Sequence, residues 1–397
     1  MPAPFFLDLS HTSHTRARTG IQRVARSLHA ALSERALAVT HDPYLGAWRL
    51  IEAWERTNLS APGAADKRRA QWPLTARLRG EFRRWSGAAR GSVARLAALK
   101  TAGLIVPEVF SPAVATALPQ LLAATRGPRI ALFHDAIALK FPELTPAKTV
   151  ARFPAYLHEL LAFDGIAAVS EDSRDSLTDY WRWLGARTPP PVQAIPLGVD
   201  EPTAVSASIP AAQRTLPTVL CVSSIEGRKN HRALLDACEQ LWTRGVKFEL
   251  RLIGLAQPDT GREALMRVRE LQAAGRVLRY DGPLGDAELE AAYAACSFTV
   301  YPSLIEGFGL PVLESLAHEK PCVCSSRGAL GESVRGGGCL ALESVDAASL
   351  ESAIERLLIS TEELGRLASD ARTREIQTWP GYARDLTAWM STLSRRD

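Results

Sequence analysis

The sequence lacks any long apolar run of the kind that crosses a membrane. No stretch reaches the roughly 18–20 uninterrupted apolar residues that span a bilayer. The nearest candidate, residues 101–125, is interrupted by Glu108 and by three prolines. The first eight residues carry no basic segment ahead of a short apolar run, unlike a secretory signal peptide. We therefore expect a cytoplasmic protein, with peripheral contact at the inner face of the cell membrane left open.

Closely spaced cysteine pairs are also missing. The six cysteines all lie in the second half of the chain, and none forms a C-x-x-C pair. Cys322 and Cys324 alternate along an expected strand, so both face the same way, which is typical of core packing. We expect no metal site and no redox role for these residues, and a reducing compartment fits them best.

The net charge is small, but it is unevenly distributed. The chain has 47 Lys and Arg against 43 Asp and Glu, a formal charge of +4 over 397 residues. This balance does not by itself indicate a nucleic-acid partner. Residues 66–100, however, hold ten basic and two acidic residues, a local net charge of +8, so the rest of the chain is slightly acidic.

Short apolar runs alternate with helical patterns almost throughout, in a chain long enough for two domains. The expected strands are residues 5–9, 37–41, 103–106, 130–134, 166–170, 192–195, 218–223, 248–253, 277–280, 298–301, 321–325 and 339–341. The expected helices are residues 21–35, 146–162, 172–184, 231–244, 262–273, 286–295, 311–318, 347–358 and 361–378. Apolar strands separated by amphipathic helices indicate parallel sheets covered on both faces.

This pattern occurs twice and predicts two doubly wound, Rossmann-like α/β domains. A proline-containing segment without apolar periodicity, residues 201–217, is the expected linker. We expect an N-terminal domain over residues 1–200, with a basic insertion near 46–100, and a C-terminal domain over 218–378. Residues 379–397 are expected to form a helix that can cross back to the first domain. Ligands bind outside the carboxyl ends of such strands, so the expected active site is the cleft between the two domains.

The most informative segment runs from Tyr301 to Glu314 and reads YPSLIEGFGLPVLE. A buried strand is expected to end at Tyr301, and Pro311 suits the first position of the following helix. Free amides at that helix start form an anion site suited to a diphosphate. Two carboxylates, Glu306 and Glu314, can accept hydrogen bonds from sugar hydroxyls. The alternative is an ordinary Gly-rich βα loop with solvated glutamates.

The E-G-F-G-L-P-x-x-E pattern, with seven residues between its glutamates, resembles the signature of retaining family 4 glycosyltransferases of the GT-B fold. The resemblance implies that Glu306 is catalytic beside the donor sugar and that Glu314 binds the donor ribose. It also implies that the amides of Phe308, Gly309 and Leu310 hold the diphosphate.

Two further segments of the C-terminal half carry the same resemblance. Residues 223–231, SSIEGRKNH, are similar to the family loop that follows the first strand of this domain. There Arg228 and Lys229 would stabilise the leaving diphosphate, and the hydroxyl of Ser224 would contact a phosphate. The alternative is a pair of exposed cations at a helix start, the unfavourable end of the helix dipole. A weaker match places Gly282 and Leu284 near the nucleotide base.

The N-terminal half resembles the family at two places. Residues 18–24 look like the glycine-containing loop after the first strand, where Gly20 would let the diphosphate approach and Arg23 would meet the acceptor. His134 and Asp135 end an apolar run, and the resemblance implies a catalytic histidine close to the reacting bond. Asp135 would orient His134 or bind an acceptor hydroxyl. A structural His–Asp pair is the alternative, and Ser170 is expected to be a helix N-cap.

Residues 66–100 interleave arginines with Trp72, Phe82 and Trp85. The segment is expected to be partly helical. It is either a solvated helical hairpin or a surface for anionic lipid or a phosphorylated acceptor. Nucleic acid is disfavoured because no nucleic-acid module accompanies the charge.

Together these features predict a glycosyltransferase, and the resemblance implies that it retains the configuration of the sugar and needs no metal or other cofactor. It would move a hexose from a nucleotide-diphosphate sugar to a hydroxyl of a glycan or lipid-linked oligosaccharide. The N-terminal elements resemble bacterial mannosyl- and rhamnosyltransferases of surface polysaccharides, so GDP-mannose is the expected donor. The alternatives are a sugar-nucleotide epimerase, a phosphorylase, and a catalytically silent sugar-nucleotide binder or membrane scaffold. A dehydrogenase is disfavoured because no G-x-G-x-x-G follows a strand.

Overall fold

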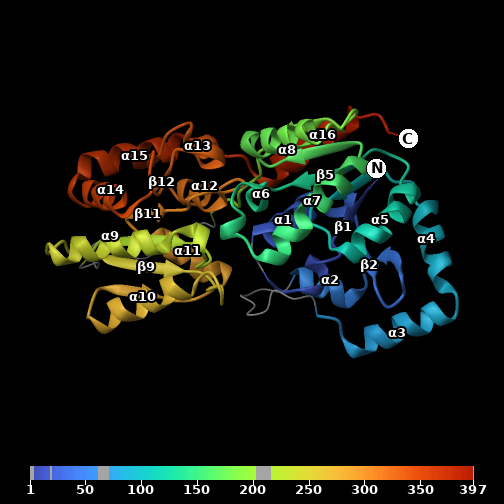
Figure 1. Ribbon diagram of the computed structural model, residues 1–397, viewed down its shortest axis with the longest axis horizontal. Helices are drawn as coiled ribbons and strands as arrows, with labels where there is room; N and C mark the ends of the chain where they lie inside the picture. Colours follow the sequence, from blue (N-terminus) through green and yellow to red (C-terminus); the bar gives the residue numbers. More distant parts are fainter. Residues whose placement is uncertain (1–3, 18–19, 61–70, 203–215, 397) are drawn as a thin grey trace. The chain divides into compact units, whose positions relative to one another are not determined.

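The computed structural model describes residues 4–17, 20–60, 71–202 and 216–396. The chain divides into two compact units (Figure 1). Unit 1 comprises Met1–Leu139, Ala147–Gly198 and Trp379–Asp397, and unit 2 comprises Lys140–Pro146 and Val199–Thr378. Most of the expected linker, residues 203–215, lies outside the described residues. Lys140–Pro146 was expected in the first domain; it groups with unit 2, where Leu144 lies beside Gly227.

Unit 1 is built on a seven-stranded sheet with the order β3-β2-β1-β4-β5-β6-β7. Its strands are β1 (Phe5–Asp8), β2 (Ala36–Asp42), β3 (Ala47–Leu50), β4 (Gly103–Val106), β5 (Arg129–Phe133), β6 (Gly165–Ala168) and β7 (Val192–Ala194). All neighbouring strands are parallel except β2 and β3, which form an antiparallel pair from Val39–Leu50 to Asp42–Ala47. The parallel strands were expected from their apolar runs, whereas β3 was not.

Helices pack on both faces of this sheet. They are α1 (Gly20–Leu32), α5 (Pro112–Ala124), α6 (Ile137–Lys140), α7 (Ala147–Glu159), α8 (Glu171–Trp183) and α16 (Trp379–Ser391). Buried side chains of α5, α7 and α8 form one core with the sheet. On α16, Met390 lies against Gly103 of β4 and Trp389 against Gly165 of β6, so the end of the chain completes unit 1.

The basic insertion contains three helices, α2 (Ala53–Ser60), α3 (Leu74–Trp85) and α4 (Ala88–Ala98). Helices α3 and α4 are joined through Gly87, whose φ of +77° suits glycine. Leu96 of α4 is buried against the sheet beside Trp48. The insertion is therefore partly embedded in the core of unit 1 and is not a freely solvated hairpin. Lys67, Arg68 and Arg69 lie outside the described residues.

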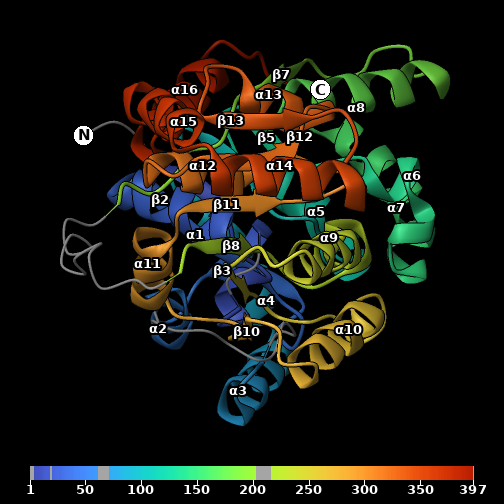
Figure 2. The same cartoon turned by 90° about the vertical axis from the view of Figure 1, so that its left-hand side faces the viewer.

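Unit 2 contains a six-stranded, fully parallel sheet with the order β10-β9-β8-β11-β12-β13 (Figure 2). Its strands are β8 (Thr218–Val222), β9 (Glu249–Ile253), β10 (Leu278–Tyr280), β11 (Phe298–Tyr301), β12 (Cys322–Ser325) and β13 (Cys339–Leu342). Its helices are α9 (His231–Thr243), α10 (Arg262–Ala273), α11 (Asp286–Ala295), α12 (Leu310–Ala317), α13 (Gly328–Val334), α14 (Ala347–Ile359) and α15 (Thr361–Thr373).

Alternation along the strands sorts side chains onto the two faces of this sheet. Val300 and Val323 join the core formed with α9, α10 and α14. Tyr301, Cys322 and Cys324 face the other way and pack with α12. The prediction that Cys322 and Cys324 belong to the core is confirmed. No helix of the described chain is both long enough and apolar enough to span a bilayer.

Candidate active site

Glu306 lies at the centre of a buried polar cluster in unit 2. The chain leaves β11 at Tyr301 and turns toward the loop that follows β8. There Lys229 Nζ lies 2.5 Å from Glu306 Oε1, and Arg228 Nη1 lies 2.8 Å from Glu306 Oε2. The hydroxyls of Tyr301 and Ser303 donate to Oε1 at 2.9 and 2.5 Å. One carboxylate therefore holds two cations that lie 77 and 78 positions away in the sequence.

The cluster keeps Glu306 ionised although it is buried. Burial alone would raise the pKa of this carboxyl, but the charges of Lys229 and Arg228 outweigh it and bring the pKa to about 2. Burial lowers the pKa of Lys229, and the charge of Glu306 opposes that shift. The arrangement supplies a permanent negative charge at a fixed position.

Arg228 and Lys229 do not lie at the start of a long helix. They belong to a short 3-10 turn, η7 (Gly227–Lys229), which ends at Asn230 with a φ of +54° before α9 begins. Arg228 also pairs with Glu226 at 2.9 Å and keeps about a quarter of its side chain exposed. Lys229 is buried, so the alternative of two solvated cations is wrong. Arg228 is the cation of the pair that retains access to a ligand.

Helix α12 starts beside this cluster. Gly309 precedes it with a φ of +102°, and a Cβ there would lie 2.8 Å from Leu330 Cδ2. Only glycine fits both constraints. Pro311 is the second helical residue, one later than expected. The Leu310 amide has no carbonyl one turn earlier in the helix, which leaves it available to an anion. Pro311 has no N–H, and the Val312 amide donates to the Gly309 carbonyl at 3.0 Å. The Phe308 carbonyl accepts from Ser333 at 3.0 Å.

Glu314 is buried on α12, where Tyr293 donates to its Oε2 at 3.2 Å. The ring of Tyr293 stacks on His318, with ring centroids 4.8 Å apart. Burial lowers the pKa of His318, which favours the neutral ring. Glu314 is thus a fixed carboxylate on the same helix whose start follows Glu306.

The other residues expected in unit 2 lie in neighbouring loops. Ser224 is half-buried in the loop between β8 and η7. Gly282 has a φ of +68°, and its carbonyl accepts from the Gly254 amide at 2.9 Å. Leu284 packs partly into the small core formed with α11. These loops all follow the carboxyl ends of β8 and β10.

In unit 1, three polar side chains lie at or just after the carboxyl ends of the adjacent strands β1, β4 and β5. They are Asp8, Glu108 and His134, all buried. Glu108 accepts from the amides of His11 and Thr12 at 2.9 and 2.8 Å and so fixes the loop after β1. Burial, reinforced by the charge of Glu108, raises the pKa of Asp8 to about 7.

His134 is oriented by the backbone. Its Nε2 lies 2.7 Å from the Pro107 carbonyl, which can only accept, so Nε2 carries the proton. Burial lowers the pKa of His134, which leaves the neutral ring with a lone pair on Nδ1. That atom can accept a hydrogen bond from a sugar hydroxyl.

Asp135 does not hydrogen-bond to His134. Its Oδ1 accepts from the Ile137 amide at 3.0 Å at the start of α6, so the proposed orienting role for Asp135 is replaced by that of Pro107.

Gly20 begins α1, and a Cβ there would meet nothing within 4 Å, so packing does not require glycine. Arg23 lies on the first turn of α1. Ser170 caps α8 by accepting from the Ser173 amide at 3.1 Å, which confirms its expected role.

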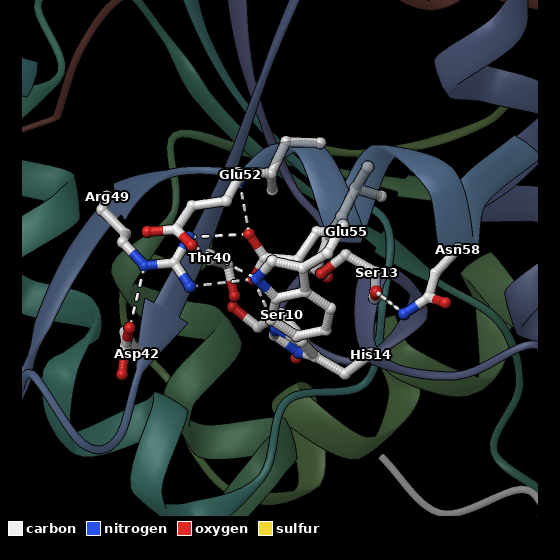
Figure 3. Close-up of polar contacts among 12 residues, drawn as sticks. Ser10, Ser13, His14, Thr40, Asp42, Arg49, Glu52, Glu55 and Asn58 are labelled. Carbon is white, nitrogen blue, oxygen red and sulfur yellow. Dashed lines mark hydrogen bonds and ion pairs between the residues drawn. The ribbon is translucent and has the colours of Figure 1, made fainter. Parts of the chain in front are cut away.

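A second buried polar network in unit 1 was not predicted (Figure 3). Arg49 of β3 makes two contacts with Glu55 of α2, at 2.7 and 2.9 Å, and a third with Asp42 at 2.8 Å. Glu55 also lies 2.6 Å from Nε2 of His14, in the turn after β1. Burial would raise the pKa of Glu55, but hydrogen bonds from His14 and Arg49 bring it below its usual value. The network ties the insertion to the loop between β1 and α1.

Sequence reasoning missed several residues that complete these clusters. Tyr301 and Ser303 bind Glu306 from within its own segment, and Asp8, Glu108 and His14 support the loop after β1. The positions of Asp8 and Glu108 could have identified them. A polar residue at or just after the end of a buried parallel strand lies at the edge of the sheet where ligands bind. Within the described residues, no group of three or more His, Cys, Asp or Glu side chains is arranged to hold a metal ion.

Comparison with known proteins agrees with this architecture. Residues 216–360 match the family model described as glycosyl transferases group 1. The chain is 33% identical over 224 residues to the MMP alpha-(1->4)-mannosyltransferase of Mycolicibacterium hassiacum, covering 55% of this chain and 51% of that protein. It is 30% identical over 264 residues to the O-antigen chain mannosyltransferase B of Escherichia coli, covering 64% and 65%. The chain thus spans about half to two thirds of the length of these relatives.

Among solved structures, Anabaena HepE in complex with UDP and glucose matches with a TM-score of 0.70 at 16% identity, over 99% of this chain and all of that one. Sucrose-phosphate synthase from Thermosynechococcus elongatus matches with a TM-score of 0.67 at 19% identity, over 98% of each chain. At these identities the likeness concerns the fold. The chain therefore has the GT-B fold, and its residues 216–360 match the glycosyl transferases group 1 family.

Proposed function

We propose that the protein is a glycosyltransferase that uses a nucleotide-diphosphate sugar. The observation that carries the proposal is the cluster in which buried, ionised Glu306 holds Arg228 and Lys229 beside the start of α12. Glycosyl transfer from such a donor develops negative charge on the departing diphosphate and positive charge on the reacting sugar carbon. The cluster offers fixed charges of both signs for these two changes.

In the proposed reaction, the partly exposed guanidinium of Arg228 and the amides of Phe308, Gly309 and Leu310, which lead into α12, bind the diphosphate. Lys229 adds positive charge from within the cluster. The Glu306 carboxylate faces the sugar and stabilises positive charge at the reacting carbon. Glu314, already held by Tyr293, accepts hydrogen bonds from the donor ribose. In unit 1, the Nδ1 lone pair of His134 accepts from a sugar hydroxyl.

We propose that the transfer retains the configuration of the sugar. The bond between the sugar carbon and the phosphate oxygen breaks, and the acceptor hydroxyl attacks the same face of the sugar. The acceptor proton passes to the departing phosphate oxygen. The proposal requires no metal, because cationic side chains and helix amides supply the positive charge.

Our proposed donor is GDP-mannose, and our proposed acceptor is a hydroxyl of a glycan or lipid-linked oligosaccharide. Two mannosyltransferases among the similar proteins support a mannose donor. The second of these is named for the O-antigen chain, which supports a glycan acceptor. The HepE complex contains UDP and glucose, so UDP-sugars are the first competitors to test.

The proposal is tested by melting the protein in the presence of GDP-, UDP-, dTDP- and ADP-sugars. A ligand that binds only the folded state raises the melting temperature by mass action. We expect GDP-mannose to give the largest increase. The matching donor is then incubated with candidate acceptors, and the anomeric configuration of the product is determined by NMR. Turnover without an acceptor would indicate an epimerase or hydrolase instead, and binding without any turnover would indicate a silent binder.

A further inference from the structure

Helix α3 of the basic insertion exposes an unusual set of apolar side chains. Leu74, Leu78, Phe82 and Trp85 are 68%, 58%, 66% and 85% exposed. Twelve large apolar residues are exposed in the described chain, and these four lie within one helix of twelve residues. Scattered exposed apolar residues need no explanation, but a contiguous set marks a surface that contacts something.

The spacing places the four side chains on one face. Steps of four, four and three residues keep them within about 80° around a helix of 3.6 residues per turn. The opposite face carries Ala76 and Gly80, which are buried; a Cβ at Gly80 would lie 2.7 Å from Tyr44 Cβ. Helix α3 is therefore seated on unit 1 by its small residues and presents its large apolar side chains to the outside. We call Leu74, Leu78, Phe82 and Trp85 the α3 stripe.

Positive charge surrounds the α3 stripe. The helix contains four arginines and one acid, Glu81, a net charge of +3. Arg79 and Arg83 lie 3.0 and 3.4 Å from Glu52. Arg77 and Arg84 have no such acidic partner among the described residues, and both are exposed. The next helix, α4, adds the exposed Arg90 and Arg95.

We propose that α3 binds the surface of an anionic lipid bilayer, with the α3 stripe inserted among the lipid headgroups. A helix of this length reaches about 18 Å and is too short to span a membrane, but it can lie in the plane of the interface. Apolar residues including Phe and Trp on one face, with arginines beside them, are typical of such helices. Trp85 and the arginines suit the zone between headgroup and acyl chain. The inference goes beyond the proposed function and does not depend on it.

The positive charge around the α3 stripe favours an anionic bilayer over a second copy of the chain as its partner. A symmetric pairing of two α3 helices would bring two groups of arginines together, which costs free energy. An anionic bilayer places negative charge opposite Arg77, Arg84, Arg90 and Arg95. Each basic residue near such a surface strengthens binding, and salt weakens the attraction.

The test is flotation of the purified protein with phosphatidylcholine vesicles, with and without phosphatidylglycerol. We compare the wild type with the double variant Phe82→Gln/Trp85→Gln and with Arg77→Gln/Arg84→Gln. The matched control is Trp183→Gln, since Trp183 of α8 is 80% exposed in the same unit but lies outside the stripe. Because all these side chains are exposed, melting temperatures should stay unchanged, which shows that each variant is folded.

We expect the wild type and Trp183→Gln to float with the phosphatidylglycerol vesicles. Phe82→Gln/Trp85→Gln should bind at least tenfold more weakly, and Arg77→Gln/Arg84→Gln should lose the preference for anionic lipid. Equal binding of the stripe variant and the wild type, or no vesicle binding by the wild type, would overturn the proposal. So would a dimer in analytical ultracentrifugation that disappears in the stripe variant, because the occupant would then be a second copy. Donor binding is measured without vesicles, so it is a separate outcome.

Discussion

The charge of Glu306 depends on two cations from another loop, and this makes a sharp prediction for a single substitution. Glu306→Gln keeps the shape but removes the negative charge between Arg228 and Lys229. We expect transfer to fall by at least a hundredfold, because the proposed role of Glu306 is to stabilise positive charge at the reacting carbon. Stability should also fall, by about 3–5 kcal/mol, since the buried Lys229 ammonium loses its carboxylate partner.

The control for this substitution is Glu226→Gln. Glu226 pairs with Arg228 at 2.9 Å but does not reach Lys229 within the described contacts. Transfer in this variant should stay within a few-fold of wild type. Initial rates with a saturating donor measure the effect of each variant on transfer, and thermal melting measures its effect on stability. Wild-type transfer by Glu306→Gln would contradict the proposed role.

Asp8 gives a prediction on pH. Its folded pKa of about 7 lies above its usual value of 3.8, so between these values the folded state binds more protons than the unfolded state. The free energy of unfolding therefore falls as pH rises through this range. Asp8→Asn removes this dependence while keeping an oxygen that can accept from the Ser10 amide. Relative to the wild type, the free energy of unfolding of the variant should rise by at most roughly 3 kcal/mol between pH 5 and pH 8.

Melting temperatures of both proteins across this pH range measure the effect. A constant difference would show that the carboxyl of Asp8 titrates normally in the folded protein.

At the scale of single residues, sequence patterns identified three residues of the Glu306 cluster but missed others that contact it. Glu306, Arg228 and Lys229 follow two strands that are far apart in the chain, and strand pairing brings them together as expected. Tyr301 was interpreted only as the end of an apolar strand, because an aromatic residue there is typical of the core. Only the structure shows that its hydroxyl reaches Glu306. Asp135 shows the opposite case, since proximity to His134 in sequence did not produce a contact.

At the scale of elements, the buried network around Glu55 holds α2 to β3 and to the turn containing His14 (Figure 3). In Glu55→Ala, the buried Arg49 guanidinium loses its contacts with Glu55 and keeps only the one with Asp42. We expect a loss of about 3–5 kcal/mol in stability. Glu52→Ala is the control, since Glu52 meets Arg79 and Arg83 near the surface and should cost under about 1 kcal/mol.

Chemical denaturation of the two variants compares these losses. Equal losses would mean that the network contributes no more than a surface ion pair.

Apolar periodicity predicted the parallel strands of both sheets and most helices of unit 2 within one or two residues. It failed in the insertion and at α5. Pro119 lies inside α5, and an internal proline argues against a helix in sequence alone. Strand β3 is only four residues long and pairs antiparallel at the sheet edge, so it lacks the repeated strand–helix pattern. Short elements supported by tertiary contacts leave little periodic signal.

At the scale of the whole molecule, the chain returns to unit 1 only after unit 2 is complete. Helix α16 packs where Gly103 and Gly165 leave room: a Cβ at Gly165 would lie 2.6 Å from Leu393 and 2.9 Å from Trp389. Gly165→Val should therefore displace α16 and destabilise unit 1 by about 1–3 kcal/mol. Gly91→Ala on α4 is the control, because a Cβ there meets nothing within 4 Å.

Hydrogen exchange followed by mass spectrometry distinguishes the two units in this experiment. Protection should fall in α1 and α16 of the Gly165→Val variant, while the strands of unit 2 keep theirs. Unchanged protection in α16 would show that the helix does not depend on that close approach.

The central claim is that the cluster around Glu306 binds the diphosphate of a nucleotide sugar. Calorimetric titration of GDP-mannose and UDP-glucose into wild type, Arg228→Met and Arg232→Met tests it directly. Arg232 lies four residues further along, on α9, where it pairs with Asp236 and is mostly exposed. We predict that a nucleotide sugar binds wild type and Arg232→Met equally, and Arg228→Met roughly ten- to a hundredfold more weakly, as expected for a lost charge-assisted hydrogen bond. Equal binding by Arg228→Met, or no nucleotide-sugar binding by the wild type, would contradict the account.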